Sequence, residues 1–195
     1  MPNSNSPDWF HQPGYKNLLV YRLATIIFDL TLEFCDLFIQ KTSRTFDQIV
    51  QAVRSGKQNI VEGSLEKSLK SYIKLVGVAR ASFEELLEDL KDFLRTKQLK
   101  LWDKNDPRVM QIRSIRIANS ANSANLPNSP NPPNLTNWKS TPESFANLLI
   151  TLIHLETYLL DQLLRSLEKK FVTAGGYTEN LFKKRSDYRK QNSGY

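Results

Sequence analysis

The chain has 195 residues, of which 40% are hydrophobic and 24% are charged, which is enough apolar material for the core of one domain with short appendages. Its 27 Lys and Arg residues outnumber its 20 Asp and Glu residues and give a net charge of +7. This excess favours polyanionic partners, meaning nucleic acid or an anionic surface, and carries no sequence specificity.

The cysteine content and the lack of a recognisable targeting signal indicate the compartment in which the protein is expected. Cys35 is the single cysteine, so an internal disulfide is excluded and a reducing compartment is favoured. It lies within an apolar helical pattern, which predicts buried packing. The N-terminus lacks the pattern of a signal peptide, and acidic residues interrupt every apolar run, so we expect a cytoplasmic protein with no membrane span.

Apolar residues recur at spacings of three and four along most of the chain, which is typical of helices. Ser43 or Thr42 can cap the second helix, Ser68 can start the third, and Asp106-Pro107 and Thr141-Pro142 are further starts. We therefore expect an all-α, antiparallel up-down four-helix bundle. Its helices are predicted near 15–41, 44–63, 68–97 and, for a split fourth helix, 106–118 and 142–172.

Small residues and low-complexity segments indicate where helices end and where the segments of the chain begin. Ala52 and Gly56 share a helix face, which predicts close helix approach, whereas Gly63 is expected to end the second helix and Gly175-Gly176 the last. The domain organisation then follows from composition. It comprises a flexible leader (1–14), a bundle (15–176) interrupted by an Asn/Ser/Pro insertion (119–140), and a basic-aromatic tail (177–195).

Catalytic chemistry finds no support in the sequence. Two isolated histidines and one cysteine cannot form a zinc site, and no glycine-rich phosphate loop is evident. The acidic pairs Glu84-Glu85 and Glu88-Asp89 are interpreted as a solvated helix face that pairs with nearby Lys and Arg. We expect a protein without enzymatic activity, cofactor or metal.

Two charged residues occupy positions that periodicity places among apolar neighbours, namely Arg80 and Glu156. Because unpaired burial of a charge is expensive, each is expected to pair with an opposite charge on another helix, with Glu62 a possible partner for Arg80. A structural role is favoured for both. Helices with two apolar stripes also bury more than one small bundle needs, which predicts a homo-oligomer.

The positive charge is concentrated in two segments. Residues 41–80 and 165–195 each contain eight Lys and Arg against three acidic residues. Phosphate contacts through such residues would give salt-dependent, largely non-specific binding; the alternative is a basic surface that is merely solvated. The candidate nucleic-acid-binding residues are Arg54, Lys57, Lys70, Lys74, Lys183, Lys184, Arg185, Arg189 and Lys190.

Three segments carry a resemblance to a known family. They are residues 54–63 (RSGKQNIVEG), residues 79–86 (ARASFEEL) and residues 167–185 (LEKKFVTAGGYTENLFKKR). The chain resembles the bacterial four-helix-bundle family that includes the large-subunit ribosomal RNA intervening-sequence protein, with the accessory variability protein of diversity-generating retroelements as a relative. The last segment is similar to the branch with a C-terminal suffix domain.

The resemblance covers nearly all of the chain except the leader and the 119–140 segment. It implies an antiparallel bundle that assembles into a ring-like pentamer with a basic surface, linked to ribosomal RNA or to a reverse transcriptase and its RNA. Two functions stay open from the sequence. The first is a non-catalytic adaptor for structured RNA, and the second is a scaffold that docks a protein partner such as a polymerase.

A final expectation concerns the tail. Tyr177, Phe182 and Tyr188 are apolar enough to dock, so we expect them to anchor the tail on the bundle while its cations face outward.

Overall fold

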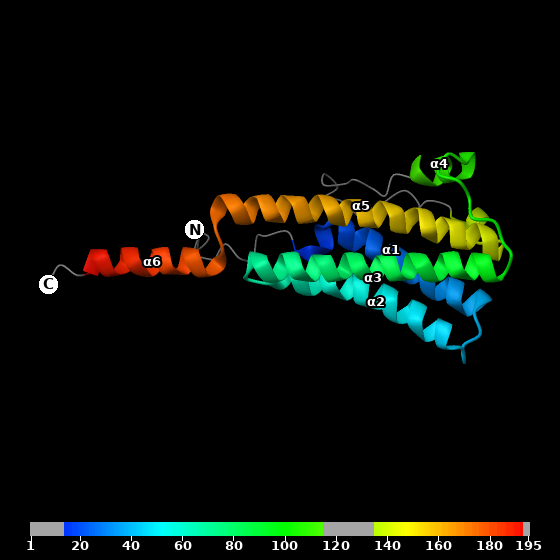
Figure 1. Ribbon diagram of the computed structural model, residues 1–195, viewed down its shortest axis with the longest axis horizontal. Coiled ribbons are helices and arrows are strands. Elements are labelled where there is room, and N and C mark those ends of the chain that lie inside the picture. Colours follow the sequence, from blue (N-terminus) through cyan, green and yellow to red (C-terminus); the bar gives the residue numbers. More distant parts are fainter. Residues whose placement is uncertain (1–13, 115–134, 193–195) are drawn as a thin grey trace, which may run out of the picture.

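A computed structural model describes residues 14–114 and 135–192 of the chain (Figure 1). Within these ranges every regular element is a helix and no strand occurs, so the predicted all-α class is confirmed. The elements in chain order are the short 3-10 helix η2 (Tyr15–Asn17), α1 (Leu19–Phe38), α2 (Arg44–Leu65), α3 (Leu69–Thr96), α4 (Pro107–Ser114), the 3-10 helix η3 (Thr136–Trp138), α5 (Pro142–Ala174) and α6 (Tyr177–Asn192).

Four long helices, α1, α2, α3 and α5, lie side by side and form the body of the molecule (Figure 1). Helix α3 packs against both α2 and α5, and α1 closes the bundle against the same two helices. The short helix α4 packs against the side of α5, near the end where α3 finishes. Helix α6 leaves the opposite end of the bundle and points away from it (Figure 1).

The helix starts follow the capping residues of the sequence. The Ser43 hydroxyl accepts a hydrogen bond from the backbone N–H of Phe46 at 3.2 Å, and the Thr141 hydroxyl accepts one from the N–H of Ser144 at 3.1 Å. Each satisfies a donor that the first helical turn would otherwise leave unpaired. The predicted starts of α2 and α5 are therefore confirmed.

The core is tied together by aromatic rings from three helices. Phe34 of α1 meets Phe93 of α3 edge-on at 5.0 Å between ring centroids, and Phe145 of α5 at 5.6 Å. Cys35 is fully buried beside them, as predicted. Burial, with a smaller contribution from Asp36, raises the pKa of its thiol to about 12, so the sulfur stays protonated and unreactive.

Two glycines permit α2 and α3 to approach closely. A Cβ at Gly56 would stand 2.8 Å from the ring of Phe83, which confirms the predicted packing role of this residue. A Cβ at Gly63 would stand 2.9 Å from the ring of Tyr72. Gly63 does not end α2, which continues to Leu65, so that prediction is wrong. The absence of a side chain at Gly63 makes room for the ring of Tyr72 and does not terminate the helix.

The predicted leader and most of the predicted insertion, residues 1–13 and 115–134, lie outside the described residues. The end of the predicted insertion does pack. Leu135 and Trp138 are partly buried against the core, and the rings of Trp138 and Trp102 lie 5.9 Å apart. Lys139 forms an ion pair with Glu33 of α1. Residues 135–140 thus belong to the folded body and lead into α5.

Candidate nucleic-acid interface

The predicted cations of α2 and α3 do not form one surface. The hydroxyls of Ser55 and Ser82, 2.9 Å apart, fix the register between these antiparallel helices. Arg54 is therefore level with the middle of α3, whereas Lys70 and Lys74 lie three turns or so nearer its start. All three side chains are exposed. The structure brings Lys70 and Lys74 together and leaves Arg54 apart from them.

Lys57 has a contact within the bundle. Its ammonium lies 3.7 Å from the ring centroid of Phe28 on α1, and the side chain is half-buried. A cation over an aromatic face contributes about 0.5–1 kcal/mol at a surface site. Lys57 therefore joins α1 to α2, and it is the least available of the four bundle cations for a ligand.

The end of the bundle where α3 starts is the most basic part of the body. Arg80 of α3 pairs with Asp161 of α5, which sets the register of these antiparallel helices. Lys70 lies ten residues before Arg80 on α3. Because α5 runs in the opposite direction, the residues level with Lys70 lie about ten positions after Asp161, in the last turns of α5. We name this region the basic end and define it by six exposed residues: Lys67, Lys70, Lys74, Arg165, Lys169 and Lys170.

Arg165, Lys169 and Lys170 contribute to the charge of the C-terminal segment but are not among the binding residues predicted from the sequence. They lie level with the start of α3 because α5 packs antiparallel to it. A charge count along the chain contains no such signal.

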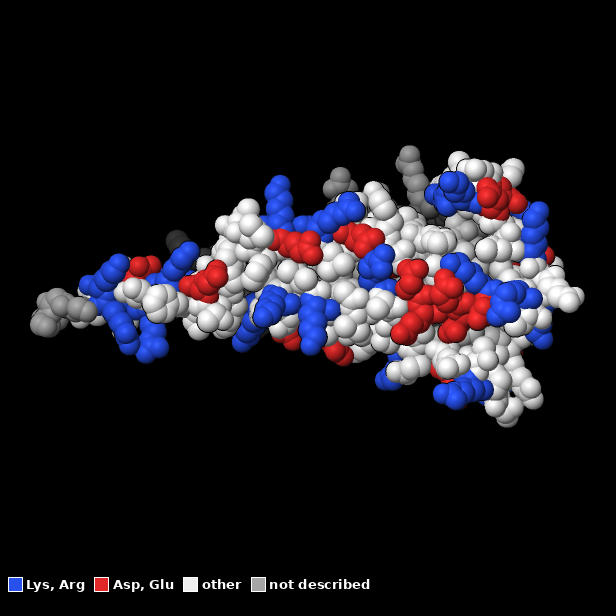
Figure 2. Space-filling view, in the orientation of Figure 1, with Lys and Arg blue, Asp and Glu red and all other residues white. Residues whose placement is uncertain are grey.

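Charge is segregated along the long axis of the molecule. Figure 2 shows Lys and Arg over α6 and along the first half of α3, and a cluster of Asp and Glu over its second half. Ion pairs within the second half neutralise many of the cations there: Asp36–Lys41, Glu88–Lys91, Asp92–Arg95 and Asp106–Arg108. In the described parts of the chain, the six residues of the basic end make no ion pair, so their charge is available to a ligand.

The tail forms a helix, α6, and its orientation is set by a turn. Gly175 ends α5 with a φ of 74°, a conformation that favours glycine. Glu179 accepts a hydrogen bond from the N–H of Gly176 at 3.0 Å, and the amide of Asn180 donates to the carbonyl of Ala174 at 3.0 Å. These bonds fix the start of α6, which then extends past the end of the bundle (Figure 1).

The expectation that aromatic residues anchor the tail on the bundle is wrong. Tyr177, Phe182 and Tyr188 are 47%, 73% and 69% exposed, and no described residue of α6 is buried. The turn at Gly175 directs α6 away from the body, so the rings have no surface within the described residues to dock against. The five predicted tail cations, Lys183, Lys184, Arg185, Arg189 and Lys190, are all exposed, as expected.

The two charged residues that periodicity places among apolar neighbours behave differently, since Glu156 is buried and Arg80 is only partly so. Arg80 donates from Nε to Asp161 at 2.6 Å, which confirms an interhelical partner, although that partner is not Glu62. Glu156 is fully buried, and neither carboxyl oxygen has a hydrogen-bond partner within the described ranges. Its expected ion pair is not formed. Burial raises the pKa of Glu156 well above its usual value, so the side chain is held in its neutral form.

Two of the hollows that the described residues line are at a distance from the basic end. One, of about 420 Å³, lies between α4 and α5 and is lined by Trp102, Lys91, Arg113 and His154. Burial and the charge of Lys91 lower the pKa of His154. The other lies between α2 and α3 beside the acidic cluster. Within the described residues no cluster of His, Cys, Asp or Glu could hold a metal ion, and no helix is long and apolar enough to cross a membrane.

Comparison with known proteins gives no relative from which to transfer a function. No family model, curated protein or solved structure matches this chain. The surface chemistry therefore has to carry the functional argument.

Proposed function

We propose that the protein is a non-catalytic adaptor that binds RNA through the basic end and α6 of an oligomeric, cytoplasmic helical bundle. The architecture we infer is an antiparallel up-down four-helix bundle in which α4 and α5 are the two parts of a split fourth helix. The choice of RNA over DNA, the pentameric assembly and membership of the bacterial family rest on the resemblance of residues 54–63, 79–86 and 167–185.

The observation that supports this proposal most strongly is the segregation of charge. Four ion pairs neutralise part of the positive charge in the half of the bundle near α4, whereas the six residues of the basic end make no ion pair within the described ranges. Unpaired surface cations repel one another, and phosphates relieve that repulsion while releasing condensed counterions. A helix with cations on several faces, extending from the same end, lengthens the surface that a nucleic-acid backbone can follow.

A protein-docking scaffold is the second candidate, and exposed apolar side chains favour it. Leu181, Phe182 and Tyr188 of α6 are more than half exposed, a pattern typical of a protein contact rather than of phosphate binding. The two functions differ in salt dependence. Binding through phosphate contacts weakens steeply with salt, whereas an apolar protein contact does not.

The decisive experiment measures binding of a labelled structured RNA by fluorescence anisotropy over a range of salt concentrations. The test variant is Lys70→Gln with Lys74→Gln, and the matched control is Lys100→Gln with Lys104→Gln, which removes the same charge from the opposite end of the bundle. We expect the test variant to lose up to about two units of salt slope, near one per phosphate contact. The control should lose little.

Equal losses in both variants would show that net charge alone drives binding, with no interface at the basic end. Absence of measurable RNA binding by the unaltered protein at low salt would reject the adaptor and leave the scaffold.

A further inference from the structure

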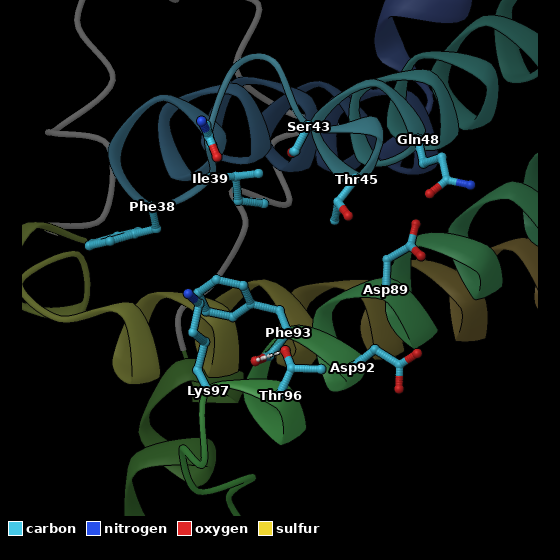
Figure 3. A pocket seen from close by; sticks show the side chains of 11 residues that line it. Phe38, Ile39, Ser43, Thr45, Gln48, Asp89, Asp92, Phe93, Thr96 and Lys97 are labelled. Carbon is cyan, nitrogen blue, oxygen red and sulfur yellow. Dashed lines mark hydrogen bonds between the residues drawn. The ribbon is translucent and has the colours of Figure 1, made fainter.

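A groove runs between α2 and α3 in the half of the bundle away from α6. Its two parts, of about 430 Å³ and about 820 Å³, share Gln48 and Asp89 and are therefore continuous. Phe38 and Phe93 supply apolar walls, and Figure 3 shows Asp89 pointing from α3 toward Thr45 and Gln48 of α2. The groove thus combines an apolar surface with carboxylates.

Three of the four carboxylates that line this groove make no ion pair within the described residues. Asp92 is paired with Arg95, but Asp47, Glu85 and Asp89 make no ion pair within the described ranges, although Arg44 and Lys97 also line the groove. Burial first, and then the neighbouring Asp92 and Glu85, raise the pKa of Asp89. A cation placed here would relieve the crowding of negative charge.

Helix α6 has the complementary surface. Tyr177, Leu181, Lys184 and Tyr188 follow one another at helical spacings of four, three and four, so they form one stripe along the helix. Arg185 lies beside it. The apolar members of the stripe are 47% to 69% exposed. A lone helix of 16 residues is marginally stable in water, so a partner that covers this stripe would stabilise it.

We propose that α6 of one copy docks into the α2–α3 groove of a second copy, with its apolar stripe against Phe38 and Phe93 and its cations on Glu85 and Asp89. The contact joins opposite ends of two identical chains. Such head-to-tail contacts generate rings when the rotation between subunits closes, and open chains when it does not.

Geometry makes the contact intermolecular. Glu85 and Asp92 lie 16 and 23 residues beyond the start of α3, about 24 and 35 Å along the bundle. Helix α6 starts at that end of the bundle and points away from it (Figure 1). In this arrangement its own groove is out of reach, and a second chain supplies one.

The test is a charge-reversal exchange, followed by sedimentation velocity without nucleic acid. Variant one carries Lys184→Glu and Arg185→Glu, and variant two carries Glu85→Lys and Asp89→Lys. Each variant alone opposes like charges and should sediment as a monomer, while the unaltered protein associates from micromolar concentration upward. In an equimolar mixture the two variants can alternate, so that each tail meets an oppositely charged groove, and association should return as open chains or even-numbered rings.

Far-UV circular dichroism confirms that each variant is folded, and Glu85→Gln with Asp89→Asn is a milder groove variant if the lysines prevent folding. A third variant, Leu181→Ser with Tyr188→Ser, keeps every charge and should lose association, because the apolar stripe is removed. A mixture that remains monomeric, or folded variants that assemble as well as the parent, would overturn the proposal. The RNA-binding proposal is tested separately, since no RNA is present here.

Discussion

Arg80 of α3 and Asp161 of α5 form an ion pair at 2.6 Å that joins two adjacent helices across 81 positions of sequence. Both side chains remain substantially exposed, at 40% and 37%. Solvent therefore screens the pair, and its two charges give specificity of register more than stability.

We expect Asp161→Asn to lower the free energy of unfolding by no more than about 1 kcal/mol, because surface-accessible pairs contribute little. A double-mutant cycle with Arg80→Gln, followed by urea denaturation, should give a coupling free energy below about 1 kcal/mol. A coupling of several kcal/mol would mean that the pair is desolvated in solution, for example by a second subunit that covers it.

The buried carboxyl of Glu156 should make stability depend on pH in the direction opposite to that of an ion-paired carboxylate. Its pKa is raised from 4.5 in the folded state, so above that pH the unfolded chain releases the proton first. Unfolding is then favoured as pH rises, by up to about 1.4 kcal/mol per unit, until the folded pKa is reached. Below the pKa values of both the folded and the unfolded state, Glu156 is protonated in each, so it adds no pH dependence to stability.

The variant Glu156→Met, which preserves the shape of the side chain, should flatten this contribution and raise the free energy of unfolding at neutral pH by about 1–3 kcal/mol. Glu168→Gln, an exposed position on the same helix, is the matched control and should change neither quantity. Denaturant titrations at a series of pH values measure both. If the free energy of unfolding of the parent rose between pH 5 and pH 8 by more than that of Glu156→Met, the raised pKa of Glu156 would be contradicted.

Helix positions and capping could be predicted from the sequence because periodicity and caps are local. Ser43 and Thr141 begin helices as their side chains predict, and Cys35 is buried as its apolar context predicts. Gly63 was misread because a glycine that ends a helix and a glycine that admits a neighbouring ring look alike in sequence. The contact with Tyr72 depends on the packing of another helix, which local patterns do not contain.

The two glycines Gly56 and Gly77 offer a matched pair of substitutions. A Cβ at Gly77 would meet nothing within 4 Å, whereas one at Gly56 would press on the buried ring of Phe83. Both changes gain helix propensity, about 1 kcal/mol each. We expect Gly77→Ala to stabilise the protein. The Gly56→Ala variant should be less stable than the Gly77→Ala variant by about 1–3 kcal/mol, which is the cost of overpacking. Equal thermal and urea unfolding of the two variants would show that α2 and α3 separate easily.

The candidate interface was only partly visible in the sequence, for a physical reason. Runs of Lys and Arg gave the tail cations directly, but whether Arg54 joins Lys70 on one surface depends on helix register, which the pair Ser55–Ser82 fixes. The docking of the tail aromatics was mispredicted because amphipathic composition does not specify which surface covers the apolar side. Here the turn at Gly175 directs them outward.

The exposed cations of α6 provide the last prediction. Replacing Lys183, Lys184 and Arg185 with Ser should weaken polyanion binding and reduce its salt slope by up to about three units, near one per phosphate contact. The fold should be unaffected, since no described residue of α6 is buried in the bundle. The control replaces Lys100, Lys104 and Arg113 with Ser at the opposite end, outside the α2–α3 groove. Because loss of self-association could also weaken RNA binding, both variants are compared at concentrations where the parent is monomeric.

If the tail variant binds RNA as tightly as the parent with the same slope, α6 is not a nucleic-acid surface, and its cations act in protein contacts instead.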